Sequence, residues 1–196
     1  MKKNKKLSPV PFILLGLILL AAGILLIFGS KIVSRLREAS LPLSYRDEIV
    51  DAAHRYGLDP DLVAAVVKTE SGFDPKAVSG DGAIGLMQVL PMTGEWIAWR
   101  RGLQFDKDRL YDPVYNLDFG CWLLSFLLER YGWNEKYALI AYNAGFARLD
   151  EWLKTDSMFD ESGELNIPYA ETRNYVEKIT RLKERYGEVY GTELDG

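Results

Sequence analysis

Apolar and polar positions alternate along most of this chain with the period of an α-helix. After residue 43, apolar side chains recur at intervals of three and four residues, in stretches that glycine, proline and aspartate separate. This spacing places them on one face of a helix. It predicts helices over residues 45–56, 60–70, 91–101, 113–131, 134–142, 146–154 and 168–186. The fold class is therefore mainly α.

Local signals mark where these helices begin. Asp59-Pro60 and Asp112-Pro113 combine an N-capping aspartate with a proline at the first helical position. Ser44 has the residue type of a cap for the first helix. The only run that resembles a strand covers residues 83–90, and Gly85 interrupts it. A polar loop is expected over residues 155–166.

The first forty residues have a different pattern. Four lysines precede an almost purely apolar run whose core, residues 10–28, is nineteen residues long. As a helix it would span roughly 28 Å, close to the thickness of a bilayer's hydrocarbon core. A cleaved signal peptide is the alternative, although its apolar region would be shorter. The sequence predicts a basic cytoplasmic tail (1–9), one transmembrane helix (10–29), a juxtamembrane tether (30–43) and an extracytoplasmic catalytic domain (44–196).

Charge supports this division. The net formal charge of −4 conceals seven basic residues and one acidic residue in the first forty positions, against 17 basic and 27 acidic residues in the rest. An acidic body argues against nucleic acid as a partner, because phosphate binding needs a basic face. The chain has one cysteine, Cys121, and one histidine, His54. A metal site built from several cysteines or histidines is therefore not expected, and no cofactor is predicted.

Glu70 is the residue with the clearest chemical potential. It follows Val66 by four positions and Val63 by seven, so it lies on the apolar stripe of its helix. Burial there raises the pKa of a carboxyl group, and the negative end of the helix dipole adds to the effect. A glutamate that stays protonated near neutral pH is suited to donate a proton to a sugar leaving group. The alternative is that the side chain bends into water at Ser71-Gly72.

Four sequence blocks then occur in a fixed order. They are Glu70-Ser71-Gly72-Phe73-Asp74-Pro75 with Ser79, then Gly85-Leu86-Met87-Gln88, then Ala141-Tyr142-Asn143-Ala144-Gly145, and finally the run from Ile167-Pro168 to Tyr175-Val176. Together they resemble the bacterial lytic transglycosylases of the lysozyme-like superfamily, over about residues 44–186. The resemblance implies a lysozyme-like helical domain. It also implies cleavage of the β-1,4 bond between N-acetylmuramic acid and N-acetylglucosamine in peptidoglycan, with formation of a 1,6-anhydromuramoyl end.

The resemblance also implies roles for single residues. Glu70 matches the family's one catalytic acid/base. Six further positions match residues that bind substrate: Ser79, Met87, Gln88, Tyr142, Asn143 and Glu171. Four of these positions have a simpler interpretation from their local sequence. Ser79 suits a turn, Met87 suits a core, and Asn143 suits the turn after its helix. Glu171 suits a solvated first helical turn, where an acid is favoured by the dipole.

Two other functions fit the same sequence. A lysozyme-type muramidase would use water in place of the substrate's own hydroxyl, and it needs a second acid, for which Asp81 is the candidate. A membrane-anchored peptidoglycan-binding scaffold would need no acid at position 70. The expected partners are peptidoglycan glycan strands and the membrane, while any partner in the cell-envelope machinery is left unidentified.

Overall fold

The structure is a computed structural model, and it describes residues 41–194 of the 196-residue chain. By its contacts the chain divides into two units, Met1–Pro42 and Leu43–Gly196. The predicted transmembrane helix and basic tail lie outside the described residues. Among residues 41–194, no helix has both the length and the apolar character needed to cross a membrane.

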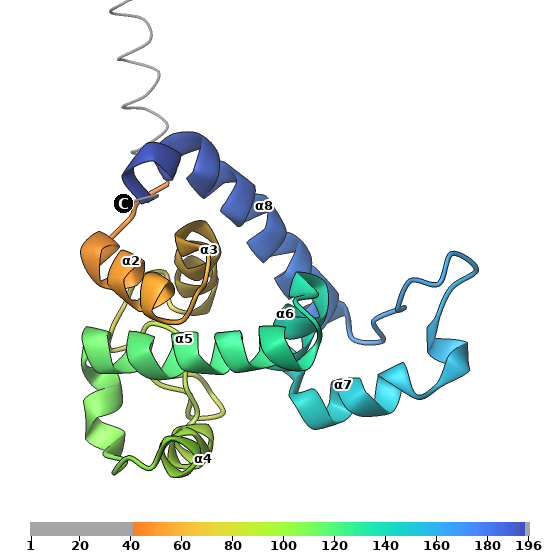
Figure 1. Ribbon diagram of the computed structural model, residues 1–196, viewed down its shortest axis with the longest axis horizontal. Coiled ribbons are helices and arrows are strands. Elements are labelled where there is room, and N and C mark those ends of the chain that lie inside the picture. Colours follow the sequence, from red (N-terminus) through yellow and green to blue (C-terminus); the bar gives the residue numbers. More distant parts are fainter. Residues whose placement is uncertain (1–40, 195–196) are drawn as a thin grey trace, which may run out of the picture. The chain divides into compact units, whose positions relative to one another are not determined.

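The described chain is built from α-helices and two short 3-10 helices (Figure 1). In chain order they are α2 (Arg46–Arg55), α3 (Pro60–Glu70), α4 (Pro91–Arg101), η1 (Lys107–Tyr111), α5 (Pro113–Arg130), α6 (Glu135–Ala144), α7 (Phe146–Leu153), η2 (Asp156–Met158) and α8 (Ala170–Leu194). The seven predicted helices correspond to these α-helices. The last one begins two residues later than predicted and continues to Leu194 rather than Tyr186.

The predicted caps form at two helices and fail at a third. The Asp59 side chain accepts from the backbone N–H of Asp61 at 3.0 Å, and the Asp112 side chain accepts from that of Tyr115 at 2.8 Å. The Ser44 prediction is wrong. The helix begins instead after Tyr45, which has a left-handed backbone (φ 58) and no side-chain cap. The aspartate signals succeed because a proline fixes the first turn, whereas Ser44 has no such neighbour.

The strand-like run over residues 83–90 does not become a strand. It forms part of a tight loop in which isolated bridges join Val78 to Ile84 and Ile84 to Val89. Gly85 lies between these bridges with φ 79, a left-handed conformation that glycine adopts without steric cost. The loop therefore folds back on itself instead of pairing with a second long strand.

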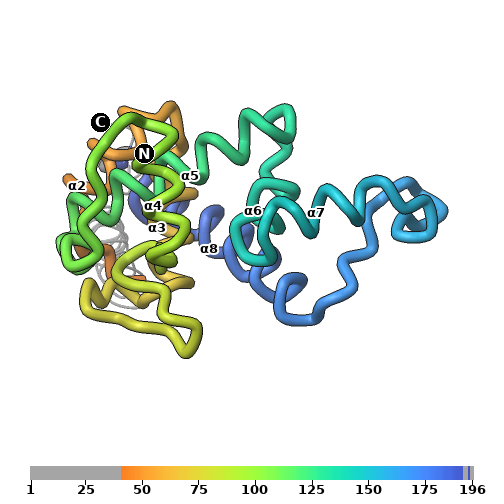
Figure 2. The backbone as a smooth tube through the Cα atoms, turned by 90° about the horizontal axis from the view of Figure 1, so that it is seen from below, coloured from red at the N-terminus to blue at the C-terminus, as the bar shows by residue number. Residues whose placement is uncertain are grey.

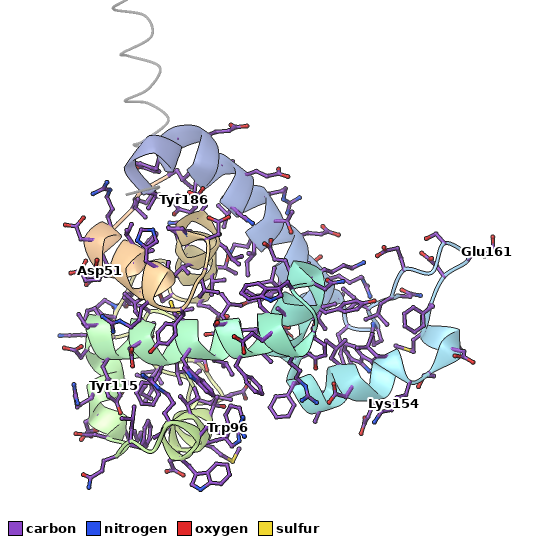
Figure 3. The ribbon with its side chains drawn as sticks, viewed as in Figure 1. Asp51, Trp96, Tyr115, Lys154, Glu161 and Tyr186 are labelled. Carbon is purple, nitrogen blue, oxygen red and sulfur yellow. The ribbon has the colours of Figure 1, made fainter. Side chains whose placement is uncertain are left out.

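The core lies between α3, α5 and α8. Residues 62–67 of α3 are all buried, as are most residues of α5. Helix α8 makes its most extensive helix contact with α3, and Figure 1 shows it running past α3 toward α6. Tyr186 of α8 is fully buried, and Figure 3 shows it between α8 and the pair α2–α3. This packing holds residues from the two ends of the body against each other.

Helix α7 and the segment that follows it extend away from this core. Figures 1 and 2 both show α7 and the segment that leads from it to α8 projecting beside α6, with Glu161 at the tip of the loop in Figure 3. The predicted polar loop over residues 155–166 is largely irregular, and η2 is its one helical turn. The chain then returns to begin α8, whose first turn lies near the end of α6.

Candidate active site

Glu70 is the last residue of α3, so its position is fixed by a buried helix. The preceding residues Val63 and Val66 are fully buried, as the helical periodicity predicts. Glu70 as a residue is partly exposed. It receives a hydrogen bond of 2.6 Å from the hydroxyl of Tyr175 to its Oε1 atom. Tyr175 is a buried residue of α8, 105 positions further along the chain.

These surroundings change the acidity of Glu70. Burial raises the pKa of its carboxyl group from 4.5 to about 7, because the charged form loses hydration. The hydrogen bond from Tyr175 and the positive charge of Lys178 act in the opposite direction but are weaker. Glu70 therefore exchanges a proton near neutral pH, which is the property required of a general acid that later becomes a base.

Two tyrosines surround this carboxyl group. Tyr142, in α6, donates its hydroxyl to the backbone carbonyl of Met87 at 2.8 Å rather than to Glu70. Burial raises the pKa of Tyr142 and of Tyr175 well above the usual range, and the charge of Glu70 adds to both effects. Both phenols therefore stay neutral. The tyrosine that bonds to Glu70 is Tyr175, which the sequence analysis did not select.

Ser71 connects Glu70 to the loop that carries Gly85-Leu86-Met87-Gln88. Its hydroxyl donates to the carbonyl of Leu86 at 2.9 Å and accepts from the N–H of Phe73 at 3.2 Å. The end of α3 and this loop are thereby fixed to each other. Ser71 was part of a quoted motif but not a predicted site residue. The available signal was its place next to Glu70 at a helix C-terminus, where free backbone groups need partners.

Met87 is a core residue in this structure. Its side chain is completely buried, and a Cβ atom at position 120 would lie 2.4 Å from its sulfur, so only Gly120 leaves it room. The placement matches the core alternative and not a side chain that lines a sugar groove. What Met87 presents toward α6 is its backbone carbonyl, the acceptor for Tyr142.

A buried amide explains how this loop is fixed. The Asn116 side chain, in α5, accepts from the N–H of Met87 at 2.7 Å and donates to the carbonyls of Ile84 and Leu110, both at 2.8 Å. Three hydrogen bonds satisfy this fully buried group, as a polar side chain in a core requires. Asn116 is not among the residues predicted from the sequence, although a polar residue within the apolar stretch of residues 114–128 was the signal.

Gln88 and Ser79 also serve the loop's own geometry. The amide nitrogen of Gln88 donates to the carbonyls of Gly85 at 3.0 Å and Ala77 at 3.2 Å. The hydroxyl of Ser79 accepts from the N–H of Ala83 at 3.0 Å, within the turn that also contains Asp81. Ser79 is exposed, so its hydroxyl combines the turn-forming function with access to solvent.

Two hollows adjoin the end of α6. A polar one of about 510 Å³ brings together Asp81, Asn143 and Glu171. An apolar one of about 470 Å³ lies between α4, α5 and α6, and it includes Tyr142 and Asn143. Glu70, Ser79, Met87 and Gln88 are not among the residues that line either of these two hollows. Three predicted residues, Tyr142, Asn143 and Glu171, therefore line the hollows. The other four are Glu70, at the end of α3, and three residues of the loop that Ser71 holds against it.

The remaining reactive groups are placed elsewhere. Cys121 is fully buried, and burial raises the pKa of its thiol far above the usual range. Within residues 41–194, no group of three or more histidine, cysteine, aspartate or glutamate side chains is arranged to hold a metal ion. The arrangement can therefore perform proton transfer at Glu70 beside neutral tyrosine hydroxyls.

Comparison with known proteins places the chain in a family. The family model for the Transglycosylase SLT domain matches residues 47–164, which is more than half of the chain. The chain belongs to this family. Helix α8, with Glu171 and Tyr175, follows the matched region.

Relatives and solved structures agree with this assignment. The membrane-bound lytic murein transglycosylase C of Actinobacillus pleuropneumoniae serotype 5b (strain L20) is 35% identical over 158 residues, covering 68% of this chain and 43% of the relative. The transglycosylase of Enterobacteria phage PRD1 is 39% identical over 139 residues, covering 65% of this chain and 49% of the relative. This chain thus spans less than half the length of these relatives.

Two solved structures show the same architecture. An inactive mutant of the lytic transglycosylase Slt from Pseudomonas aeruginosa, in which a glutamine replaces a glutamate, has a TM-score of 0.69 at 30% identity. The match covers 77% of this chain and 25% of the Pseudomonas aeruginosa protein. The 70 kDa soluble lytic transglycosylase of Escherichia coli has a TM-score of 0.71 at 28% identity, over 78% of this chain and 25% of that one. That enzyme is also known in complex with bulgecin A. The fold is the mainly helical, lysozyme-like fold of this family.

Proposed function

We propose that this protein is a membrane-anchored peptidoglycan lytic transglycosylase, with Glu70 as its only catalytic acid/base. The observation that carries the proposal is the environment of Glu70. It ends a buried helix, it has a pKa of about 7, and it accepts a hydrogen bond from a neutral tyrosine. Family membership supports the substrate class, and the inactive glutamate-to-glutamine mutant of the Pseudomonas aeruginosa relative supports the role of a glutamate.

The proposed reaction proceeds by two proton transfers at one carboxyl group. Protonated Glu70 donates its proton to the oxygen of the β-1,4 bond, which breaks and leaves N-acetylglucosamine with a free hydroxyl. The positive charge that develops at C1 of N-acetylmuramic acid is shared by the substrate's own 2-acetamido oxygen. Glu70, now a carboxylate, takes the proton of the C6 hydroxyl as that oxygen bonds to C1. One carboxyl group suffices because the nucleophile belongs to the substrate, unlike the usual pair of carboxylates in glycosidases.

The pKa of about 7 suits both halves of this cycle. Near neutral pH a large fraction of the protein carries the proton that the first step needs. After donation, the same group is basic enough to accept a proton from the hydroxyl. Tyr175 binds Oε1, so Oε2 is the oxygen of the carboxyl group outside that hydrogen bond. We assign the transferred proton to Oε2.

The other predicted residues are proposed to bind or shape the glycan site. Asn143 and Glu171 border the polar hollow, where they would contact a saccharide directly. Tyr142 borders the apolar hollow and fixes the backbone of Met87. Ser79, Met87 and Gln88 would act mainly by holding the loop beside Glu70, because their polar or apolar contacts are made within the protein.

The anchor is part of this proposal. Residues 1–9 would form a cytoplasmic tail, 10–29 the membrane span, 30–43 the tether and 44–196 the extracytoplasmic catalytic domain. The apolar run and its flanking lysines support it, as does the name of the relatives called membrane-bound. Peptidoglycan lies outside the cytoplasmic membrane, so the substrate requires this orientation.

A lysozyme-type muramidase is the second candidate, and one observation favours it. Asp81 lies on the same polar hollow as Asn143 and Glu171, where an acid could position a water molecule. The two reactions give different products, since an anhydro end is lighter than a hydrolysed end by one water.

The test is a digest of purified peptidoglycan with the full chain, analysed by mass spectrometry. We expect anhydro ends from the wild type, and a loss of at least about a thousandfold in rate for Glu70→Gln, which cannot donate the proton. Glu184→Gln, at an exposed glutamate of α8, is the matched control and should retain full activity.

Three outcomes would contradict the proposal. Reducing ends alone, lost in Asp81→Asn, would show a muramidase. Peptidoglycan binding by the wild type without any cleavage would show a scaffold protein. Full activity in Glu70→Gln would show that the acid lies elsewhere.

A further inference from the structure

The hydroxyl of Thr172, a buried residue of α8, is bonded to a side chain that borders both hollows. Among the side chains that the structure describes, and leaving aside tyrosines, the buried polar ones are those of Asn116, Ser125 and Thr172. Asn116 and Ser125 bond to backbone groups and so hold the fold. Thr172, which is 3% exposed, donates its hydroxyl to Oδ1 of Asn143 at 2.8 Å.

Asn143 occupies a special position between the hollows. It lies in the last turn of α6, just before Gly145 ends the helix with φ 88. It is exposed, and only it and Ala144 line both the polar and the apolar hollow. A glycan strand that occupied both hollows would therefore pass this side chain.

The bond from Thr172 decides which end of the Asn143 amide is available. A carboxamide has an oxygen that accepts and a nitrogen that donates two hydrogen bonds. With Oδ1 held by Thr172, Nδ2 is the end left for a ligand. At Asn143 the site therefore offers the Nδ2 amide group as a hydrogen-bond donor, and its partner is an oxygen atom of the ligand.

We propose that Thr172 is a positioning residue, which fixes the Asn143 amide so that Nδ2 donates to an oxygen acceptor of the bound glycan. This rests on the proposed function for the identity of the glycan. The acceptor is an acetamido carbonyl, a carboxylate or a hydroxyl oxygen. Thr172 lies three residues before Tyr175, on the same face of α8. One helix turn thereby aligns both the acid, through Tyr175, and the donor, through Thr172.

The test compares Thr172→Val with Thr172→Ser in the full chain acting on purified peptidoglycan. Valine keeps the shape but removes the hydroxyl, so we expect KM to rise about threefold to tenfold while kcat stays within about twofold. Serine should restore most of the loss. The pH dependence should not move, because Thr172 does not contact Glu70. Asn143→Asp keeps the held oxygen and replaces the donor by an acceptor, so its KM should rise further.

Thr180→Val is the matched control, because Thr180 lies on the same helix and bonds only to the backbone carbonyl of Val176. Its kinetic constants should equal those of the wild type. The NMR signals of the Asn143 side-chain NH2 group, identified by their loss in Asn143→Asp, report the hydrogen bond without any turnover. They should shift in Thr172→Val and remain in place in Thr180→Val.

The proposal would be overturned by an unchanged KM in Thr172→Val, by NH2 signals that do not respond, or by failure of serine to restore binding. If the Thr172→Val variant melts at a lower temperature and this loss of stability accounts for the whole kinetic change, the hydroxyl of Thr172 has only a structural role. A wild type that releases no anhydro ends would contradict the proposed function and not the Thr172 bond, which the NH2 signals test by themselves.

Discussion

Glu70 and Asp118 are two acidic side chains on core helices, and their surroundings move their pKa values in opposite directions. Asp118, in α5, has a side chain that is 18% exposed. It accepts hydrogen bonds from Arg101 at 2.7 Å, Tyr56 at 2.5 Å and Arg55 at 3.1 Å. Glu70 accepts one, from Tyr175.

The partners explain the difference. Burial raises the pKa of both carboxyl groups. At Asp118 the hydrogen bonds and charges of Arg101, with the bonds from Tyr56 and Arg55, outweigh burial and hold the pKa below its usual range. At Glu70 the hydrogen bond from the neutral hydroxyl of Tyr175 and the charge of Lys178 do not outweigh burial. Asp118 keeps a permanent charge that joins α2, α4 and α5. Glu70 keeps a proton that it can exchange.

The comparison separates structural from chemical use of a buried acid. A cation in direct contact makes ionisation part of the fold, so the group cannot exchange protons near neutral pH. A neutral partner orients the acid while leaving it titratable. Four predictions test this distinction.

The largest loss of stability is expected at Asp118. Asp118→Ala leaves Arg101 partly buried without its partner, and we expect unfolding free energy to fall by about 3 kcal/mol. Urea unfolding followed by tryptophan fluorescence at pH 7 would measure it. Asp51→Ala, at an exposed position of α2, should stay within about 0.5 kcal/mol of the wild type. A loss below about 1 kcal/mol at Asp118 would show that the network does not hold the helices together.

Glu70→Gln should act on stability in the opposite direction. Because the folded state raises the pKa of Glu70 from 4.5 to about 7, it binds a proton that the unfolded chain has released between these values. Wild-type stability should therefore fall as pH rises through this window. At pH 8 the glutamine variant should be more stable by up to about 3 kcal/mol, and at pH 4 the difference should vanish. A difference that does not depend on pH would contradict the shifted pKa.

Tyr175→Phe should have a smaller effect, which is visible in the pH profile. The hydrogen bond from Tyr175 lowers the pKa of Glu70, so its removal should raise that pKa above about 7. The alkaline limb of kcat/KM should move to higher pH, since the protonated acid persists further. Tyr142→Phe is the control, because that hydroxyl bonds to the backbone of Met87. An equal shift in both variants would assign the effect to general polarity instead of the bond.

The smallest effect is expected at Arg55. Its side chain is 56% exposed, against 18% for Arg101, although both contact Asp118. Arg55→Gln should cost about 0.3–0.5 kcal/mol and should become neutral at high salt, whereas Arg101→Gln should cost several times more. Equal losses would show that burial of the cation does not govern this network.

The sequence predicted the helices where short-range rules apply. Asp59-Pro60 and Asp112-Pro113 mark helix starts because the cap and the proline act within one turn. The same local periodicity placed Glu70 on the buried stripe of α3, and the raised pKa follows from that position. Ser44 fails as a cap because its residue type alone does not fix the backbone of the next residue.

Only the tertiary structure decided which side chains meet. The sequence selected Tyr142 as a substrate-binding residue and did not select Tyr175, which bonds to Glu70 from 105 residues away because α8 packs along α3. The packing of α8 against α6 brings Thr172 to Asn143. Met87 was expected along the groove, and the absence of a side chain at Gly120 admits it to the core instead.

The chain by itself therefore determined the helical fold class, the family resemblance and the identity of the titratable acid, since each depends on residues that are near neighbours or on a motif. The tertiary structure decided which hydroxyl holds the acid, which amide faces the hollows and which motif residues serve the core. Those choices depend on the packing of helices that are distant in sequence, and no local rule encodes it.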